Sequence, residues 1–241
     1  MAEALRVNGL HAGYGEAVVL QAIDFSLAAG QTLALLGRNG TGKTTLIDTL
    51  MGVTTQHQGE IWLGDQALHR MAAPARALAG MGWVPQERNI FRSLTVDENL
   101  SAVHHQPEGR AARWTPQRVY ELFPRLAERR DNLGHQLSGG EQQMLVVGRA
   151  LVLNPHWLLL DEPLEGLAPI IVEELLRAIA RLTREEGLGA IIVEQHPQAI
   201  LAISDRVLVL EGGRVVHDGE AAPLRADAAP LARWLGVGPK D

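Results

Sequence analysis

The residues with the clearest chemical potential run from Gly37 to Thr45 and read Gly-Arg-Asn-Gly-Thr-Gly-Lys-Thr-Thr. Gly37, four further residues and then Gly42-Lys43-Thr44 have the spacing of a P-loop. Glycines let backbone N–H groups converge on an anion, and the helix that follows presents its positive end there. Lys43 is expected to reach the terminal phosphates and Thr44 to hold Mg²⁺. A plain glycine-rich turn before a helix would explain the glycines alone. The chain is therefore predicted to bind a nucleoside triphosphate, through Gly37, Arg38, Asn39, Gly40, Thr41, Gly42, Lys43, Thr44 and Thr45.

Two carboxylates follow a second apolar run. Residues 157–160 read Trp-Leu-Leu-Leu, which is typical of a parallel strand buried on both faces, and Asp161 and Glu162 come directly after them. Asp161 is predicted to hold Mg²⁺ together with Thr44. Glu162 is predicted to face the γ-phosphate and to polarise the attacking water. Acids at strand ends are common, so this assignment depends on the P-loop beside it.

A third motif, Leu-Ser-Gly-Gly-Glu-Gln, occupies residues 137–142. Ser138 and Glu141 have the spacing of a capping box, and Gly139 and Gly140 fall in the first turn of the predicted helix. Glycines there leave backbone N–H groups exposed. We expect Ser138, Gly139, Gly140 and Glu141 to form a second phosphate-binding helix end.

Composition narrows the class of protein. The 241 residues carry a formal net charge of −6 and no cysteine, which excludes disulfides and thiolate catalysis. An acidic chain without a clustered basic surface argues against nucleic acid as a partner. No apolar run approaches the roughly 18 residues that span a bilayer. Because the N-terminal residues do not resemble a signal peptide, a cytoplasmic location is expected.

The order of predicted elements indicates an α/β fold. Alternating strands at residues 5–10 and 23–27 favour an N-terminal antiparallel β-subdomain, and the later alternation of strands and helices favours a mostly parallel, RecA-like sheet. Helical patterns with capping signals fill the middle of the chain. The prediction is one domain, 1–241, made of an α/β core (1–86 and 153–220), an inserted helical subdomain (87–152) and a C-terminal tail (221–241).

The P-loop, the Ser-Gly-Gly-Glu-Gln sequence about a hundred residues later, and the apolar strand ending in Asp-Glu-Pro together resemble the nucleotide-binding subunit of an ATP-binding-cassette (ABC) transporter. In that family two subunits sandwich two ATP molecules head to tail. The resemblance implies that Tyr14 stacks on adenine and that Gln86 contacts the Mg²⁺ and the water. It further implies that Ser138, Gly139 and Gly140 bind the γ-phosphate of the ATP held by the partner.

Two positions depart from the family pattern. Ten residues before Asp205 the family usually has a histidine, but this chain has Gln195, with His196 one position late. A glutamine can donate a hydrogen bond to the γ-phosphate but cannot accept a proton as histidine does; we favour Gln195 for this role over a shifted His196. Farther back, Leu164 replaces a common serine or threonine, and Ala168 replaces a common aspartate.

These departures, Glu-Gly-Leu-Ala-Pro at 165–169 and Val-Glu-Gln at 193–195, resemble one branch of the family, the second ATPase subunit of high-affinity branched-chain amino-acid importers. The resemblance implies a second ATP-binding subunit, identical or different, two membrane permease subunits and, indirectly, a periplasmic or extracellular solute-binding protein. It places the chain on the inner face of the cell membrane. Importers of urea or short-chain amides have nearly the same motifs. A soluble ABC ATPase and a P-loop kinase are the alternatives from other classes.

Overall fold

The structure is a computed structural model that describes residues 3–107, 111–195, 197–227 and 229–235. Its centre is a six-stranded sheet in the order β10-β9-β3-β8-β7-β6, in which β10 alone runs antiparallel to its neighbour. A second, antiparallel sheet has the order β2-β1-β4-β5. The predicted α/β class with an antiparallel N-terminal part is confirmed. The strands are β1 (Leu5–Tyr14), β2 (Ala17–Leu27), β3 (Thr32–Gly37), β4 (Thr55–Leu63), β5 (Gln66–Ala67), β6 (Met81–Val84), β7 (Trp157–Asp161), β8 (Gly189–Val193), β9 (Arg206–Glu211) and β10 (Arg214–Glu220).

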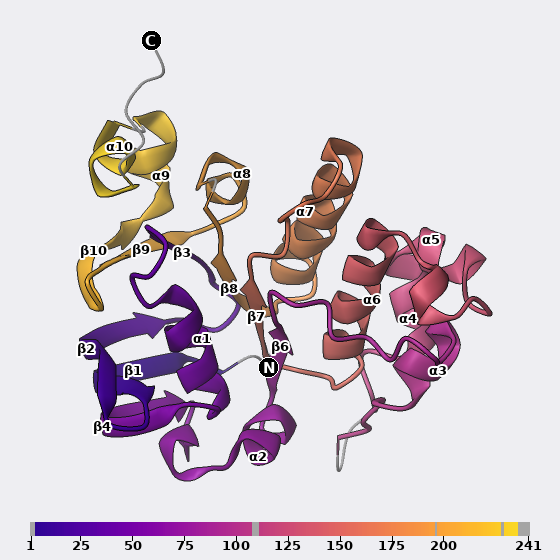
Figure 1. The fold of residues 1–241 in the computed structure, drawn as a ribbon, viewed down its shortest axis with the longest axis horizontal. Coiled ribbons are helices and arrows are strands. Elements are labelled where there is room, and N and C mark those ends of the chain that lie inside the picture. The colour runs from indigo at the N-terminus through magenta and orange to yellow at the C-terminus, as the bar shows by residue number, and fades with distance from the viewer. Residues whose placement is uncertain (1–2, 108–110, 196, 228, 236–241) are drawn as a thin grey trace.

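Helices cover both faces of the central sheet (Figure 1). Helix α1 lies between this sheet and the antiparallel sheet, and α3 to α6 gather on the opposite side of the molecule. The described helices are α1 (Lys43–Met51), α2 (Ala73–Leu78), α3 (Val96–Ser101), α4 (Pro116–Leu122), α5 (Pro124–Glu128), α6 (Gly139–Leu151), α7 (Pro169–Arg184), α8 (Pro197–Leu201), α9 (Ala221–Ala226) and α10 (Ala229–Leu235), with 3₁₀ turns η1 (Leu68–Arg70) and η2 (Gly134–Gln136).

Successive residues of strand β3 show why this sheet needs two covers. All six of its residues are buried. Leu33 and Leu35 pack in the core shared with α1 and the antiparallel sheet, whereas Ala34 and Leu36 pack in the core shared with α6 and α7. Because side chains alternate along a strand, a continuous apolar run is stable only with apolar layers on both sides.

The two N-terminal strands are longer than their alternation predicts. Strand β1 continues to Tyr14 and β2 begins at Ala17. Their pairing register shifts between Leu10 and Gly13, and Ala22 in β2 has a φ of 51°. Such bulges break the period-two pattern that sequence reasoning follows.

The predicted division into an α/β core, an inserted helical subdomain and a tail stays a prediction. Figure 1 shows α3 to α6 together at one side and α9 and α10 together beyond strands β9 and β10. Capping boxes at Thr95 and Ser138 start α3 and α6 as their sequences indicate. No helix among the described residues is long and apolar enough to cross a membrane.

Candidate nucleotide site

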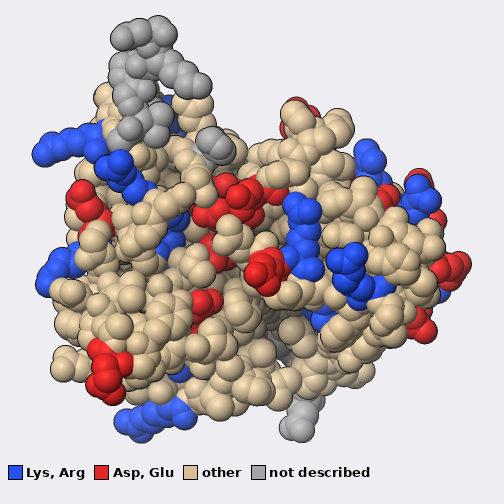
Figure 2. Space-filling model, viewed as in Figure 1, with Lys and Arg blue, Asp and Glu red and all other residues tan. Residues whose placement is uncertain are grey.

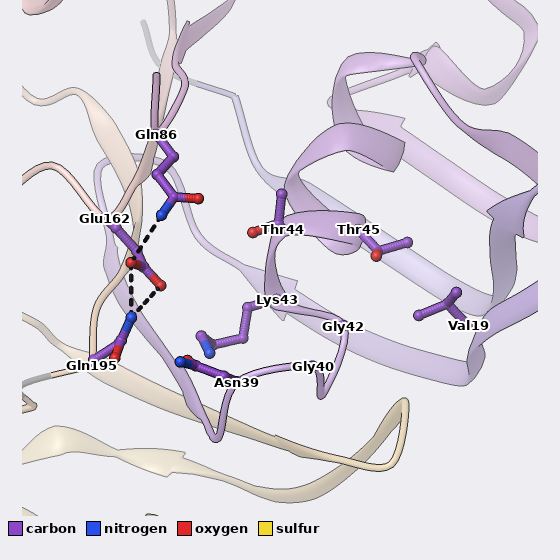
Figure 3. A pocket seen from close by; sticks show the side chains of 10 residues that line it. All are labelled: Val19, Asn39, Gly40, Gly42, Lys43, Thr44, Thr45, Gln86, Glu162 and Gln195. Atoms are coloured by element: carbon purple, nitrogen blue, oxygen red, sulfur yellow. Dashed lines mark hydrogen bonds between the residues drawn. The ribbon is translucent and has the colours of Figure 1, made fainter. Parts of the chain in front are cut away.

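The predicted site residues meet at the carboxyl ends of four adjacent parallel strands. Strand β3 leads into the P-loop, β7 ends at Asp161 with Glu162 next, β8 is followed by Gln195, and β6 by Gln86. A cleft of about 280 Å³ lies there, and Figure 3 shows its lining. It is lined by Val19, Asn39, Gly40, Gly42, Lys43, Thr44, Thr45, Gln86, Glu162 and Gln195. Ligands in open α/β sheets occupy this edge.

The P-loop has the geometry that an anion site requires. Gly42, the N-cap of α1, has a φ of 103° and supplies no side-chain cap, so the first N–H groups of the helix are left for a ligand. A Cβ on Gly37 would lie 2.5 Å from the Leu210 carbonyl oxygen, so only glycine fits. The Nζ of Lys43 donates to the carbonyl oxygens of Gly37 and Arg38, at 2.9 and 3.0 Å. Lys43 is thus a cation held at the loop by neutral acceptors that a phosphate can replace.

Asp161 fits the role of a metal ligand. It is 2% exposed, and its Oδ1 is buried with no hydrogen-bond partner. Burial raises the pKa of Asp161 to about 6, against a hydrogen bond from Thr44 that lowers it. An unpartnered buried oxygen beside a threonine hydroxyl is the oxygen-rich setting that Mg²⁺ prefers. Among the described residues no cluster of three or more His, Asp or Glu could hold a metal, so a cation here would need oxygens from the substrate and water.

Burial also lowers the pKa of Lys43, and the nearby carboxylates of Glu162 and Asp161 act in the opposite direction. The amine therefore faces two acids across the cleft (Figure 3). A triphosphate entering between them brings negative charge next to those acids. This arrangement favours a metal cation bound with the triphosphate, because the cation separates the like charges.

Two glutamines hold the carboxylate of Glu162 (Figure 3). The Nε2 of Gln195 donates to Oε1 and Oε2 of Glu162 at 3.1 and 2.9 Å. The Nε2 of Gln86 lies 3.4 Å from Glu162 Oε2 and donates to Glu165 Oε2 at 3.0 Å. The backbone at Glu162 has a φ of 47°, an uncommon conformation that turns its side chain into the cleft. His196, the alternative to Gln195, lies outside the described residues.

Other predicted residues lie apart from this cleft. Tyr14 is 51% exposed, and its hydroxyl donates to Asp48 on α1 at 3.0 Å. Ser138 accepts from the Glu141 N–H at 3.3 Å, and Glu141 accepts from the Ser138 N–H at 2.8 Å. This capping box, Gly139 and Gly140 all belong to the start of α6, outside the cleft lining. Their roles with a nucleotide stay predictions.

Sequence reasoning missed two acids around the site. Glu165 accepts from Gln86, as described above. Glu194, 4% exposed, accepts the Leu164 N–H at 2.9 Å through Oε1. Burial raises the pKa of Glu194 to about 7, although the N–H groups of Leu164 and Gln195 lower it. A lone acid directly after an apolar strand was the available signal.

The raised pKa of Glu194 predicts a pH effect on folding. The folded chain binds this proton more tightly than the unfolded chain, so the contribution to stability is full below about pH 4.5 and is lost as the pH rises to about 7. We expect Glu194→Gln, which keeps the acceptor for Leu164, to remove up to about 3 kcal/mol of this loss. Urea unfolding at pH 5 and pH 8 measures it. Parallel losses in both proteins would contradict the assignment.

Comparison with known proteins supplies the class. The ABC transporter family model matches residues 20–165. The chain belongs to the ABC transporter family. This ABC protein is 40% identical over 212 residues to the high-affinity branched-chain amino acid transport ATP-binding protein BraG of Pseudomonas aeruginosa, covering 88% of this chain and 91% of BraG. It is 33% identical over 234 residues to the lipopolysaccharide export system ATP-binding protein LptB of Escherichia coli K12, covering 96% and 97%.

A solved ADP-bound ATP-binding cassette of an ABC transporter has the same fold, with a TM-score of 0.81 at 22% identity, over 99% of this chain and all of that one. The predicted P-loop NTPase fold is confirmed. As a member of this family the ABC protein binds ATP and is an ATP-hydrolysing subunit of a transporter.

Proposed function

We propose that the chain powers the import of branched-chain amino acids by hydrolysing ATP between two subunits. The observation that carries the substrate class is the 40% identity to BraG across 88% of the chain. The Glu-Gly-Leu-Ala-Pro and Val-Glu-Gln sequences, which resemble the same branch, support it.

The site geometry supports a direct hydrolytic mechanism. The P-loop N–H groups and Lys43 bind the β- and γ-phosphates, and Thr44 with Asp161 would hold Mg²⁺. Bound Mg²⁺ would neutralise charge that develops on the phosphate oxygens. Glu162 accepts a proton from a water whose oxygen bonds to the γ-phosphorus, while the bond from that phosphorus to the ADP oxygen breaks. Gln195 and Gln86 keep the carboxylate of Glu162 aimed at this water. Tyr14 stacks on the adenine.

The site of one subunit is completed by another. Ser138, Gly139, Gly140 and Glu141 form a helix start that contributes to the γ-phosphate of ATP held by the partner subunit. The partner is a second ATP-binding subunit, identical or different. Two permeases hold the pair at the inner face of the membrane, and a periplasmic or extracellular binding protein delivers substrate. We propose no contact with nucleic acid, since acidic and basic side chains mix over the face in Figure 2.

Co-purification tests this assignment. The chain is isolated from detergent-solubilised membranes and its associated chains are identified. Two permeases, another ATPase and a stimulation of ATP hydrolysis by a leucine-loaded binding protein are expected. Stimulation by a urea- or amide-loaded binding protein instead would favour the sister importers. A lipopolysaccharide export complex is the second candidate, favoured by the 33% identity to LptB across 96% of the chain. Recovery without any membrane protein would favour a soluble ABC ATPase.

The sequence predicts that Ile90 and Phe91 receive the permease, and the structure distinguishes the two. Ile90 packs against the core, whereas Phe91 is 42% exposed with the Arg149 guanidinium 4.1 Å from its ring centroid. We expect Phe91→Ser to lower substrate uptake about tenfold or more, with ATP binding unchanged, because apolar anchors dominate interfaces. Vesicle uptake measures it. Val53→Ser, at an apolar side chain 49% exposed elsewhere, is the control. Equal uptake by both variants would refute the contact.

A further inference from the structure

Arg88 connects two parts of the chain that serve different ATP molecules under the proposed function. Its Nε donates to the Oε1 of Gln143 at 3.1 Å, and its NH2 donates to the Glu165 carbonyl oxygen at 3.0 Å. Gln143 belongs to α6, one turn beyond Gly139, and is 3% exposed. Glu165 lies three residues after Glu162. One guanidinium therefore touches both the start of α6 and the loop that carries the hydrolytic carboxylate.

The guanidinium also fills the space beside two glycines. A Cβ placed on Gly139 would lie 2.8 Å from the NH1 of Arg88, and one on Gly166 would lie 4.0 Å from its NH2. Arg88 forms no ion pair within the described residues, so its partners are one amide oxygen and one backbone carbonyl. A planar group with fixed N–H directions constrains both partners at once, which the point charge of a lysine cannot do.

The segment around Arg88 is held on the same two sides by its neighbours. Toward the catalytic loop, Gln86 donates to the side chain of Glu165, whose carbonyl Arg88 holds. Toward α6, Arg149 donates to the carbonyl oxygen of Asn89. In Figure 2 acidic side chains lie near the middle of the face, with basic ones beside them on the side of α6. Residues 86–89 thus form a brace between the catalytic loop and α6, and Arg88 is its only member that contacts both directly within the described structure.

We propose that Arg88 is a positioning residue that makes the start of α6 and the Glu162 loop move as one unit. This inference rests on the proposed two-subunit site. There Glu162 acts on ATP bound to its own subunit, while Ser138 to Gly140 act on ATP bound to the partner. A change at one ATP is then transmitted through Arg88 to the other. The role concerns hydrolysis and its cooperativity, and it leaves the binding of nucleotide to the P-loop alone.

The test compares Arg88→Ala, Arg88→Lys and Gln143→Ala in the intact complex that co-purifies with the chain. Loss of hydrogen bonds to a charged group is expected to lower kcat about tenfold and to reduce the Hill coefficient for ATP toward 1. ADP affinity of the chain, measured by titration, stays within about twofold because the P-loop is untouched. Arg88→Lys restores part of kcat. The Arg88→Ala/Gln143→Ala double variant is no worse than either single one, as expected for one shared contact.

Arg92→Ala is the matched control, since Arg92 is exposed on the same segment and its side chain has no hydrogen bond or ion pair in the described structure. Arg88→Ala with the kcat and Hill coefficient of Arg92→Ala would overturn the proposal. So would a fall in ADP affinity and melting temperature equal to the loss of kcat, because that pattern marks a role in folding alone. The readouts use ATP and ADP only, so a wrong transported substrate leaves them unchanged and is detected separately by the binding-protein stimulation.

Discussion

Replacing Glu162 with Gln is expected to lower ATP hydrolysis by about 100-fold or more while ATP binding is kept. A positioned base contributes roughly 10²- to 10⁴-fold, and an amide cannot take the proton from water. The Gln195 Nε2 lies 2.9 and 3.1 Å from the two carboxylate oxygens, so an amide of the same size keeps a partner at this position. Phosphate release by the purified complex measures the loss.

Glu121→Gln is the control for this change, because Glu121 is an exposed acid on α4, far from the cleft lining. It should hydrolyse ATP at the parent rate. Turnover near the parent rate in the Glu162 variant would rule out this carboxylate as the base.

Lys43→Ala is expected to weaken ATP binding instead, by about 10- to 100-fold. A hydrogen bond to a charged group contributes roughly 1.5–3 kcal/mol, and the phosphates lose this partner. The two carbonyl oxygens that now accept from Lys43 border the open P-loop and can be hydrated, so the fold is expected to survive. Titration calorimetry with ATP and Mg²⁺ measures the affinity. Arg70→Ala, which removes an exposed cation on η1, is the control. Unchanged affinity in the Lys43 variant would remove the P-loop from nucleotide binding.

The parts of the site that the sequence predicts are those encoded locally. The P-loop, the strand that ends in Asp161 and the capping box of Ser138 each depend on neighbours within about six residues. Their elements form where the patterns indicate, because glycine positions and caps determine backbone geometry directly. The order of the strands that brings β7 and β8 beside β3 is a long-range property that no such pattern contains.

Contacts between distant segments account for what was missed. Arg88 meets Gln143 across 55 residues, and Gln86 meets Glu165 across 79. Neither pair has a spacing signal, since the partners come together only when the sheet and α6 have packed. Tyr14 illustrates the same limit: its expected stacking on adenine concerned a ligand, whereas its hydroxyl contact with Asp48 depends on where α1 lies. Leu164 is 9% exposed and packs in the core, which gives a physical reason for an apolar residue there.

The central claim is that the P-loop site is completed only when two subunits close on ATP. Native mass spectrometry of the Glu162→Gln chain with ATP and Mg²⁺, alone and with the ATPase subunit that co-purifies with it, tests this most directly. The account predicts a species containing two ATP-binding chains and two ATP molecules, which disappears when Lys43 is also replaced by Ala. Single chains that each retain one ATP, in both samples, would contradict it.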